Sequence, residues 1–304
     1  MISLLLILIS TLFFVGIIKK VKARIAARKM PSILQPAYDV IRLFKKGAIY
    51  SRTTSFIFKI APLVYFSSVL LAALFIPIGS QKALLSFEGD FVFFAYLLGI
   101  GKFMMIISAM DTGSSFEGMG ANREALYSML VEPAFFILAG SLALFTDNIS
   151  FNDLFLHLKL DTSLYYIIGI ASTYVLIYIA MVENSRMPVD DPKTHLELTM
   201  VHEVMILDNS GFDLGLIHIV TWLKFSIYGA LISNFIISNS WAFYWQILAF
   251  FGIQLAFSAT IGMLESFKAR NKLEKNPQWI IMLSAISIVV FLTALIITQK
   301  IILN

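Results

Sequence analysis

The sequence contains no cysteine and few charged residues. Without cysteine, the chain cannot form disulfides, bind an iron–sulfur cluster through its own thiolates or use a cysteine nucleophile. Charged residues make up 14% of its 304 residues and hydrophobic residues 59%, whereas soluble domains are about 25% charged. These figures exclude an ordinary water-soluble domain. They predict an integral membrane protein, and any redox metal that works with it must lie in a partner.

Motifs of hydrolases, nucleotide enzymes and zinc proteases are also missing. The chain has no G-x-S-x-G, no Walker loop, no H-E-x-x-H and no G-x-G-x-x-G before a strand. His195 and His202 are seven residues apart and would share a helix face, but two histidines without a third ligand are a weak zinc signal. The modest net charge of +4 does not indicate a nucleic-acid partner. We expect no catalytic residue, no metal and no cofactor in this chain.

Eight apolar runs are long enough to cross a bilayer, which takes about 20 apolar residues as a helix. They cover residues 2–18, 60–78, 91–110, 125–145, 164–181, 214–236, 241–264 and 279–298. The first run lacks the basic start and the cleavage site of a signal peptide, so we interpret it as a retained helix. These runs predict an all-α polytopic membrane protein. Because no internal repeat or low-complexity linker is present, we expect residues 1–304 to form a single integral membrane domain.

Basic residues are concentrated in alternate loops. The loops at about 19–59, 111–124, 182–213 and 265–277 contain eighteen of the 23 Lys and Arg residues. The loops on the other side contain only Lys82, Lys159 and Lys300. Because basic residues are retained on the cytoplasmic side, we predict a cytoplasmic (inner) membrane protein with both termini outside the cytoplasm.

Loop 19–59 contains a basic amphipathic segment. Apolar and basic side chains interleave in it, at Ile33, Leu34, Tyr38, Ile41, Arg42, Leu43, Phe44, Lys45 and Lys46. This pattern predicts an amphipathic cytoplasmic helix at the membrane surface. The helix rests on anionic lipid or forms a docking surface for a peripheral protein, and both interpretations can hold at once.

Three residues of the types Asp, Glu, Lys and Arg fall inside the predicted spans, where a charge costs at least about 2.5 kcal/mol. Glu132 precedes Pro133, which is expected to kink the helix and open a polar pocket. Glu132 is either a neutral acid bonded to a neighbouring helix or a member of a proton path, and we favour the proton path. Lys102 and Lys224 lie toward cytoplasmic ends of their spans, where they either snorkel to the interface or pair with carboxylates such as Glu132 or Glu183.

Residues 181–211 form the densest ionisable segment. They include Glu183, Arg186, Asp190, Asp191, Lys193, His195, Glu197, His202, Glu203 and Asp208. Residues 193–207 predict a helix, preceded by Pro192 and partly tucked into the protein by its apolar side chains. We expect a carboxylate row at the membrane surface that leads inward to Glu183 and Glu132. The glycine-rich residues 111–122 predict a tight facing loop.

The order of these motifs resembles a known family. ENSRMPVD at 183–190, EL at 197–198 and DNSG at 208–211 resemble the signature loop of complex I subunit 1 and its hydrogenase relatives. In the quinone-reducing branch that loop is approximately ETNRAPFDLxExExEL, and Lys193 and His195 stand where two of its glutamates would be. Three other segments, at 23–46, 110–125 and 129–133, are similar to the membrane subunit of formate hydrogenlyase and of other energy-converting group 4 [NiFe]-hydrogenases.

The resemblance implies a membrane anchor without its own redox cofactor. It implies that the chain seats hydrophilic large and small hydrogenase subunits, which hold the [NiFe] centre and iron–sulfur clusters, beside antiporter-like membrane subunits and lipid. The expected proton path and its coupling residues are Glu132, Glu183, Arg186, Asp190, Glu197, Glu203, Lys102 and Lys224. The loop residues expected near the partner are Asp111, Glu117, Arg123, Asp191, His195, His202 and Asp208. Two alternatives are the quinone-site subunit of an NADH or ferredoxin dehydrogenase and a stand-alone cation carrier.

Overall fold

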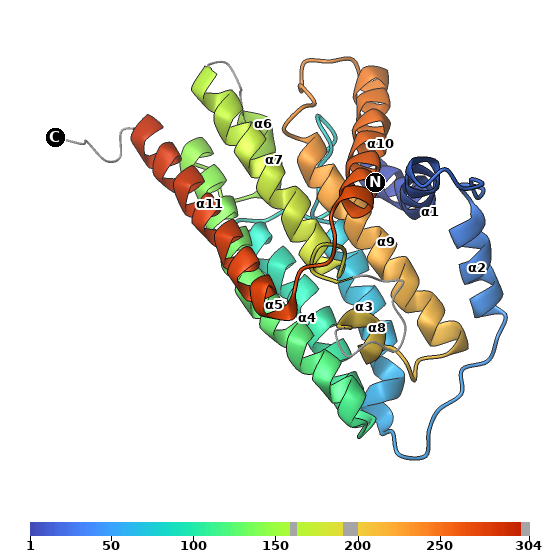
Figure 1. Cartoon of the computed structure of the whole chain (residues 1–304). Helices are drawn as coiled ribbons and strands as arrows, with labels where there is room; N and C mark the ends of the chain where they lie inside the picture. Colours follow the sequence, from blue (N-terminus) through green and yellow to red (C-terminus); the bar gives the residue numbers. More distant parts are fainter. Residues whose placement is uncertain (159–162, 191–199, 299–304) are drawn as a thin grey trace.

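The computed structural model describes residues 1–158, 163–190 and 200–298, which form helices and connecting turns without a strand among them. Eight helices are long and apolar enough to span a membrane (Figure 1). They are α1 (Ile2–Ile25), α3 (Phe56–Ala73), α4 (Asp90–Asp111), α5 (Ser115–Thr146), α7 (Ser163–Glu183), α9 (Gly211–Ser233), α10 (Phe243–Phe267) and α11 (Asn276–Ile297). The prediction of an all-α polytopic membrane protein with eight spans is confirmed.

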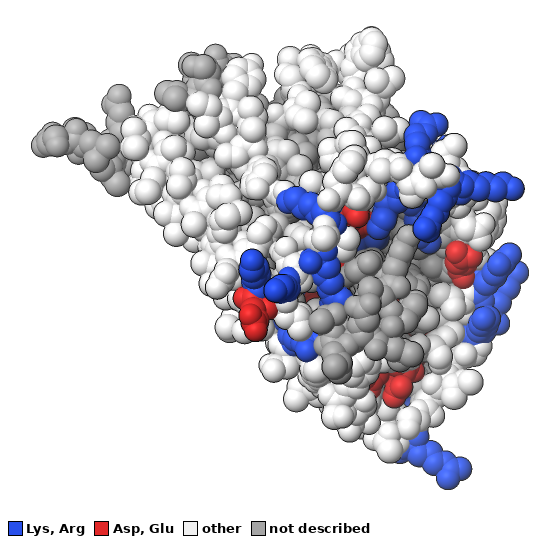
Figure 2. All heavy atoms as spheres, viewed as in Figure 1, with Lys and Arg blue, Asp and Glu red and all other residues white. Residues whose placement is uncertain are grey.

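Short helices lie between the spanning helices. They are α2 (Gln35–Phe44), α6 (Phe151–His157), α8 (His202–Met205) and a 3-10 turn at Leu273–Lys275. Segments 26–55, 112–114 and 268–275, together with the described residues 184–190 and 200–210, lie at one end of the bundle, which we call the basic end. Figure 2 shows the Lys and Arg side chains of this view gathered on the half of the molecule that contains α2.

Helix α9 is the central helix of the bundle. It packs against α1, α3, α7 and α10, and 83% of its spanning window is buried, against 28–56% in the other seven spans. A helix that is apolar all round is expected in such a central position. Outside it, α3 packs along α4, α5 along α11 and α1 along α10. A charge on α9 is therefore surrounded by protein rather than lipid.

The amphipathic helix predicted in loop 19–59 is confirmed as α2. It buries Pro36 and Val40, and Val40 packs with Val15 of α1 and Trp222 of α9. The segment before α2 lies in close contact with α1, because a Cβ atom at Gly16 of α1 would clash with the backbone carbonyl of Ile33. A glycine in α1 thus allows the chain before α2 to lie against the bundle.

The prediction of a loop at 111–124 is wrong for most of its length. Helix α5 already begins at Ser115, because the Ser114 side chain accepts a hydrogen bond from the Glu117 N–H and caps the helix. Gly120 lets another segment approach, since a Cβ atom there would lie 2.8 Å from the carbonyl oxygen of Val201. These first turns are polar and carry no apolar run, so hydropathy alone did not identify them as helix.

Of the helix predicted at 193–207, the described part of the chain contains only a short piece. Residues 193–199 lie outside the described residues, and beyond them only His202–Met205 is helical. Val201, Val204 and Met205 are buried, as predicted for a segment that tucks into the protein. Here the chain packs on α5. The carboxylate of Asp190 accepts hydrogen bonds from the N–H groups of Val201 and His202. These N–H groups therefore bond to a distant side chain and not to the carbonyl groups of a longer helix.

Candidate functional site

Four charged side chains from four different helices meet inside the bundle. Lys102 of α4 places its Nζ atom 3.0 Å from Oε1 of Glu124 in α5 and 3.2 Å from Oε1 of Glu183 in α7. Lys224 of α9 places its Nζ atom 3.1 Å from Oε2 of Glu183. Their side chains are at most 10% exposed. We call these four residues the inner cluster.

The inner cluster decides between the two interpretations of its lysines. Both Lys102 and Lys224 are buried and ion-paired, so neither snorkels to the membrane surface. The predicted alternative, pairing with Glu183, is confirmed. The ammonium of Lys224 also lies 5.1 Å from the centre of the Tyr65 ring, a cation–π contact. Two cations balance two carboxylates, which reduces the large cost of burying each charge alone.

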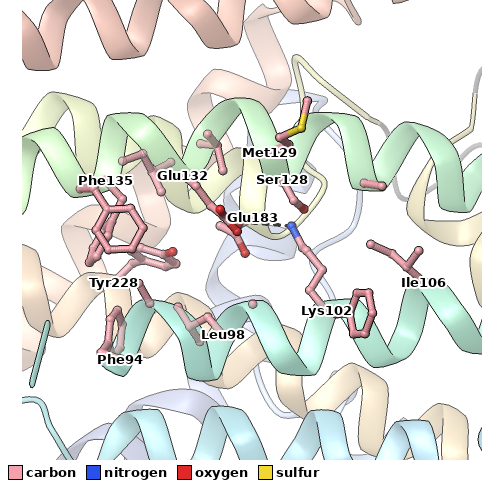
Figure 3. A pocket seen from close by; sticks show the side chains of 17 residues that line it. Phe94, Leu98, Lys102, Ile106, Ser128, Met129, Glu132, Phe135, Glu183 and Tyr228 are labelled. Atoms are coloured by element: carbon pink, nitrogen blue, oxygen red, sulfur yellow. Dashed lines mark ion pairs between the residues drawn. The ribbon is translucent and has the colours of Figure 1, made fainter. Parts of the chain in front are cut away.

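Glu132 lies beside the inner cluster but outside its ion pairs. A cavity of about 220 Å³ lies between α4 and α5 and is lined by Glu132, Lys102, Glu183 and Tyr228. Figure 3 shows the Glu132 carboxyl group directed toward Glu183 across this cavity. The described residues include no ion-pair partner for Glu132, in contrast to the pairing that we allowed for it with Lys102 or Lys224.

The same cavity reaches the flank of the isolated chain. Glu132 and Pro133 are exposed there, and the rim residues Phe103 and Met129 are 59% and 63% exposed. Helix α5 continues through Pro133 without a break. Glu132 therefore connects the buried charges with a lateral surface in the middle of a spanning helix.

A second group of charges ties the basic end together. Glu265 at the end of α10 has no exposed side-chain surface and lies 2.6 Å from Lys22 and 3.3 Å from Arg186. Asp190 pairs with Arg270 at 2.7 Å. Burial raises the pKa of the Asp190 carboxyl group, and the hydrogen bond and charge of Arg270 oppose that shift.

A cavity of about 340 Å³ lies at the basic end between α1, α2, α9 and the turn after α7. Its wall combines apolar and ionisable side chains. The lining includes Val15, Ile18, Lys19, Lys22, Asp39, Val40, Asn184, Ser185, Arg186, Asp190, His202, Glu203, His218 and Trp222. Burial lowers the pKa of His202 to about 4, which keeps its imidazole neutral at physiological pH. We call this space the basic-end cavity.

Apart from Glu124, the charged residues predicted in the loop at 111–124 hydrogen-bond to backbone groups at the basic end and are not part of the inner cluster. The Asp111 carboxylate accepts a hydrogen bond from the Ser55 N–H at 2.7 Å. Glu117 accepts one from the Asp208 N–H at 3.1 Å, and Arg123 donates to the Met200 carbonyl at 2.9 Å. The predicted residues Asp191, Lys193, His195 and Glu197 lie outside the described residues.

Sequence reasoning missed four charged residues of these groups: Lys22, Glu124, Glu265 and Arg270. The sequence places Lys22 in the loop after the first span, Glu124 in the loop before the fourth, and Glu265 and Arg270 in the loop after the seventh. Each lies within six residues of the end of an apolar run, where side chains on neighbouring helices can meet. Among the described residues, no group of three or more His, Cys, Asp or Glu is arranged to hold a metal ion.

The fold and the site define a multi-pass membrane protein with a charged interior beside a basic surface. A family model described as NADH dehydrogenase matches residues 1–299. The chain therefore belongs to this family, and the family resemblance predicted from the sequence is confirmed.

Individual relatives include subunits of hydrogenases and of complex I. The chain is 34% identical over 128 residues to hydrogenase-4 component C of Escherichia coli (strain K12), which covers 42% of this chain and 41% of that protein. It is 28% identical over 203 residues to formate hydrogenlyase subunit 4 of the same organism, covering 66% and 64%. NADH-ubiquinone oxidoreductase chain 1 of Chondrus crispus is 26% identical over 194 residues, covering 61% and 59%. The chain thus spans less than two thirds of the length of each of these relatives.

A solved structure shares the fold. A chain in the structure of the membrane-bound sulfane sulfur reductase, an archaeal respiratory membrane complex, superposes with a TM-score of 0.80 at 20% sequence identity. The match covers 95% of this chain and 98% of that one. At this identity the likeness establishes the fold of the chain and not its activity.

Proposed function

We propose that this chain is the membrane anchor and ion-coupling subunit of a respiratory-type [NiFe]-hydrogenase complex of the formate hydrogenlyase kind. The relatives named as hydrogenase-4 component C and formate hydrogenlyase subunit 4 support this assignment. In the proposed complex, the chain seats hydrophilic large and small hydrogenase subunits at the basic end. Those partners hold the [NiFe] centre and the iron–sulfur clusters, and the coupling to proton translocation takes place in this chain.

The observation that carries the proposal is the inner cluster with its cavity to Glu132. Lys102 lies within 3.2 Å of two carboxylates at once. A change of charge near either carboxylate therefore changes how strongly the Lys102 ammonium group pairs with each of them. In a low-dielectric interior such a change is weakly screened, and one pKa unit corresponds to about 1.36 kcal/mol. A redox change above the basic end thereby alters the proton affinity of Glu132, which faces Glu183 across the cavity.

The position of Glu132 also supports a membrane partner. A charge that faces lipid within a span costs at least about 2.5 kcal/mol, and Glu132 is exposed on the flank of the isolated chain. In the proposed complex an antiporter-like membrane subunit covers this flank and receives the proton. Lipid covers the rest of the spanning surface, and the basic end faces the cytoplasm.

The experiment is purification of the native complex through a tag on this chain. We expect copurified nickel, hydrogen evolution and proton transport that depends on hydrogen evolution after reconstitution into liposomes. A complex without nickel, or one that evolves hydrogen but moves no protons, would contradict the proposal.

A second candidate function, the quinone-site subunit of an NADH or ferredoxin dehydrogenase, is favoured by the basic-end cavity. Its apolar wall at Val15, Ile18 and Trp222 and its neutral His202 suit a ring with polar substituents. The same purification separates the two candidates. Quinone-dependent electron uptake by a nickel-free complex would support the second candidate and exclude the first.

A further inference from the structure

Helix α7 ends in a turn that usually contains glycine, but this chain has Ser185 there. The Arg186 N–H donates to the Met181 carbonyl at 2.8 Å and the Ser185 N–H to the Val182 carbonyl at 3.0 Å. This pair of bonds defines a Schellman motif, in which the residue at the position of Ser185 adopts a left-handed conformation and is usually glycine. Ser185 has φ +48°, a value that L-residues with a side chain adopt only at a conformational cost. The end of the helix alone would favour glycine, so the serine side chain requires another explanation.

The Ser185 side chain reaches the inner cluster. Its hydroxyl group donates a hydrogen bond to Oε2 of Glu124 at 3.2 Å, and the serine is 3% exposed. The other oxygen of the same carboxylate, Oε1, lies 3.0 Å from Nζ of Lys102. Glu124 is therefore held at both oxygens, by a cation on one side and by a hydroxyl donor on the other.

Ser185 also borders the basic-end cavity, together with His202 and Arg186. Its neighbour Asn184 uses its side-chain amide on the Ala180 carbonyl of α7 at 2.8 Å, so Asn184 does not supply the donor to Glu124. Ser185 stands between a polar space at the basic end and the first carboxylate of the inner cluster.

We propose that Ser185 is a positioning residue, whose hydroxyl group fixes Glu124 between the basic-end cavity and Lys102 and so connects the inner cluster to that cavity. The proposal rests on the proposed ion-coupling function. A hydrogen-bond donor at this position is sufficient, and the hydroxyl group does not itself carry the proton. Without the donor, Glu124 loses its hydrogen bond to the wall of the basic-end cavity, and the buried charges respond less to events at the basic end.

Two substitutions separate this role from helix termination. Ser185→Gly favours the left-handed backbone and removes the donor, so the complex should still assemble, because the backbone gain offsets part of the cost of leaving a Glu124 oxygen without its donor. We expect the number of protons transported per hydrogen evolved to fall at least twofold in liposomes. Ser185→Asn retains a residue that tolerates the left-handed conformation and supplies amide donors, so it should keep most of the wild-type ratio.

The outcomes are distinct. A wild-type ratio in Ser185→Gly would overturn the proposal, because Glu124 would then need no donor. A ratio in Ser185→Asn as low as in Ser185→Gly would also overturn it, because a donor would then be insufficient. Failure of the wild-type complex to transport protons would overturn the proposed function and this proposal together, whereas a transporting wild type with an unaffected Ser185→Gly variant would overturn this proposal alone.

Discussion

The ammonium group of Lys224 lies 3.1 Å from Oε2 of Glu183, and the Lys224 side chain has no exposed surface. Glu183 is the last residue of α7, and its other oxygen pairs with Lys102. A single carboxylate thus joins two lysines from different helices. Because removal of one member of a buried ion pair leaves an uncompensated charge, the two residues should depend on each other for stability.

Lys224→Met is expected to destabilise the purified complex by about 3–5 kcal/mol, the scale for breaking a buried pair. The double variant Lys224→Met/Glu183→Gln should recover part of this loss, because Lys102 and Glu124 still balance each other. Thermal unfolding in detergent measures both effects, with the exposed Lys272→Met as the control. The single variant Glu183→Gln completes the cycle, and losses that simply add in the double variant would show that Lys224 and Glu183 do not interact.

Acidification should destabilise the protein through His202. Burial lowers the pKa of His202 from 6.5 to about 4; Glu124 opposes the shift, while Lys102, Lys224 and His218 add to it. The folded protein thus holds this group neutral, so its contribution to stability is complete above pH 6.5 and is lost as the pH falls from 6.5 to 4. The melting temperature should fall more between pH 7.5 and pH 5 in the wild type than in His202→Gln. The same pH dependence in both proteins would assign the acid sensitivity to other groups.

Gly16→Ala should disturb the seating of α2. A Cβ atom at Gly16 would clash with the Ile33 backbone, and backbone cannot move aside as a flexible side chain can. The matched control is Gly140→Ala in α5, where a Cβ atom would meet nothing within 4 Å. The control should be neutral or more stable by about 0.5–1 kcal/mol, because alanine favours a helix interior. Limited proteolysis in the segment before α2 distinguishes the two, and equal cleavage would contradict the packing described here.

The spanning helices were predictable because a long apolar run is a local property of the sequence. Lys102, Lys224 and Glu132 were also identifiable, since an ionisable residue inside such a run is costly and needs a partner. The pairing was not predictable from the sequence. Glu183 lies 81 positions after Lys102 and 41 before Lys224, and only the packing of α4, α7 and α9 brings them together.

Glu124 shows a second limit of sequence reasoning. It lies in the polar first turns of α5, which hydropathy assigned to a loop, and its role depends on Lys102 and Ser185 from other elements. The basic end posed the same difficulty, because the helix at 202–205 and the turn after α7 are held by Asp190, Arg123 and other tertiary contacts rather than by local propensity.

Proton transport by the complex carrying Glu132→Gln tests the central claim most directly. Gln is close to isosteric with Glu, and Glu132 has no ion pair within the described residues, so the variant should assemble and melt like the wild type. The account predicts that protons transported per hydrogen evolved fall at least about tenfold, as expected when a positioned proton-transfer group is lost, while the exposed control Glu88→Gln remains at the wild-type ratio. Normal transport by an assembled Glu132→Gln complex would contradict it.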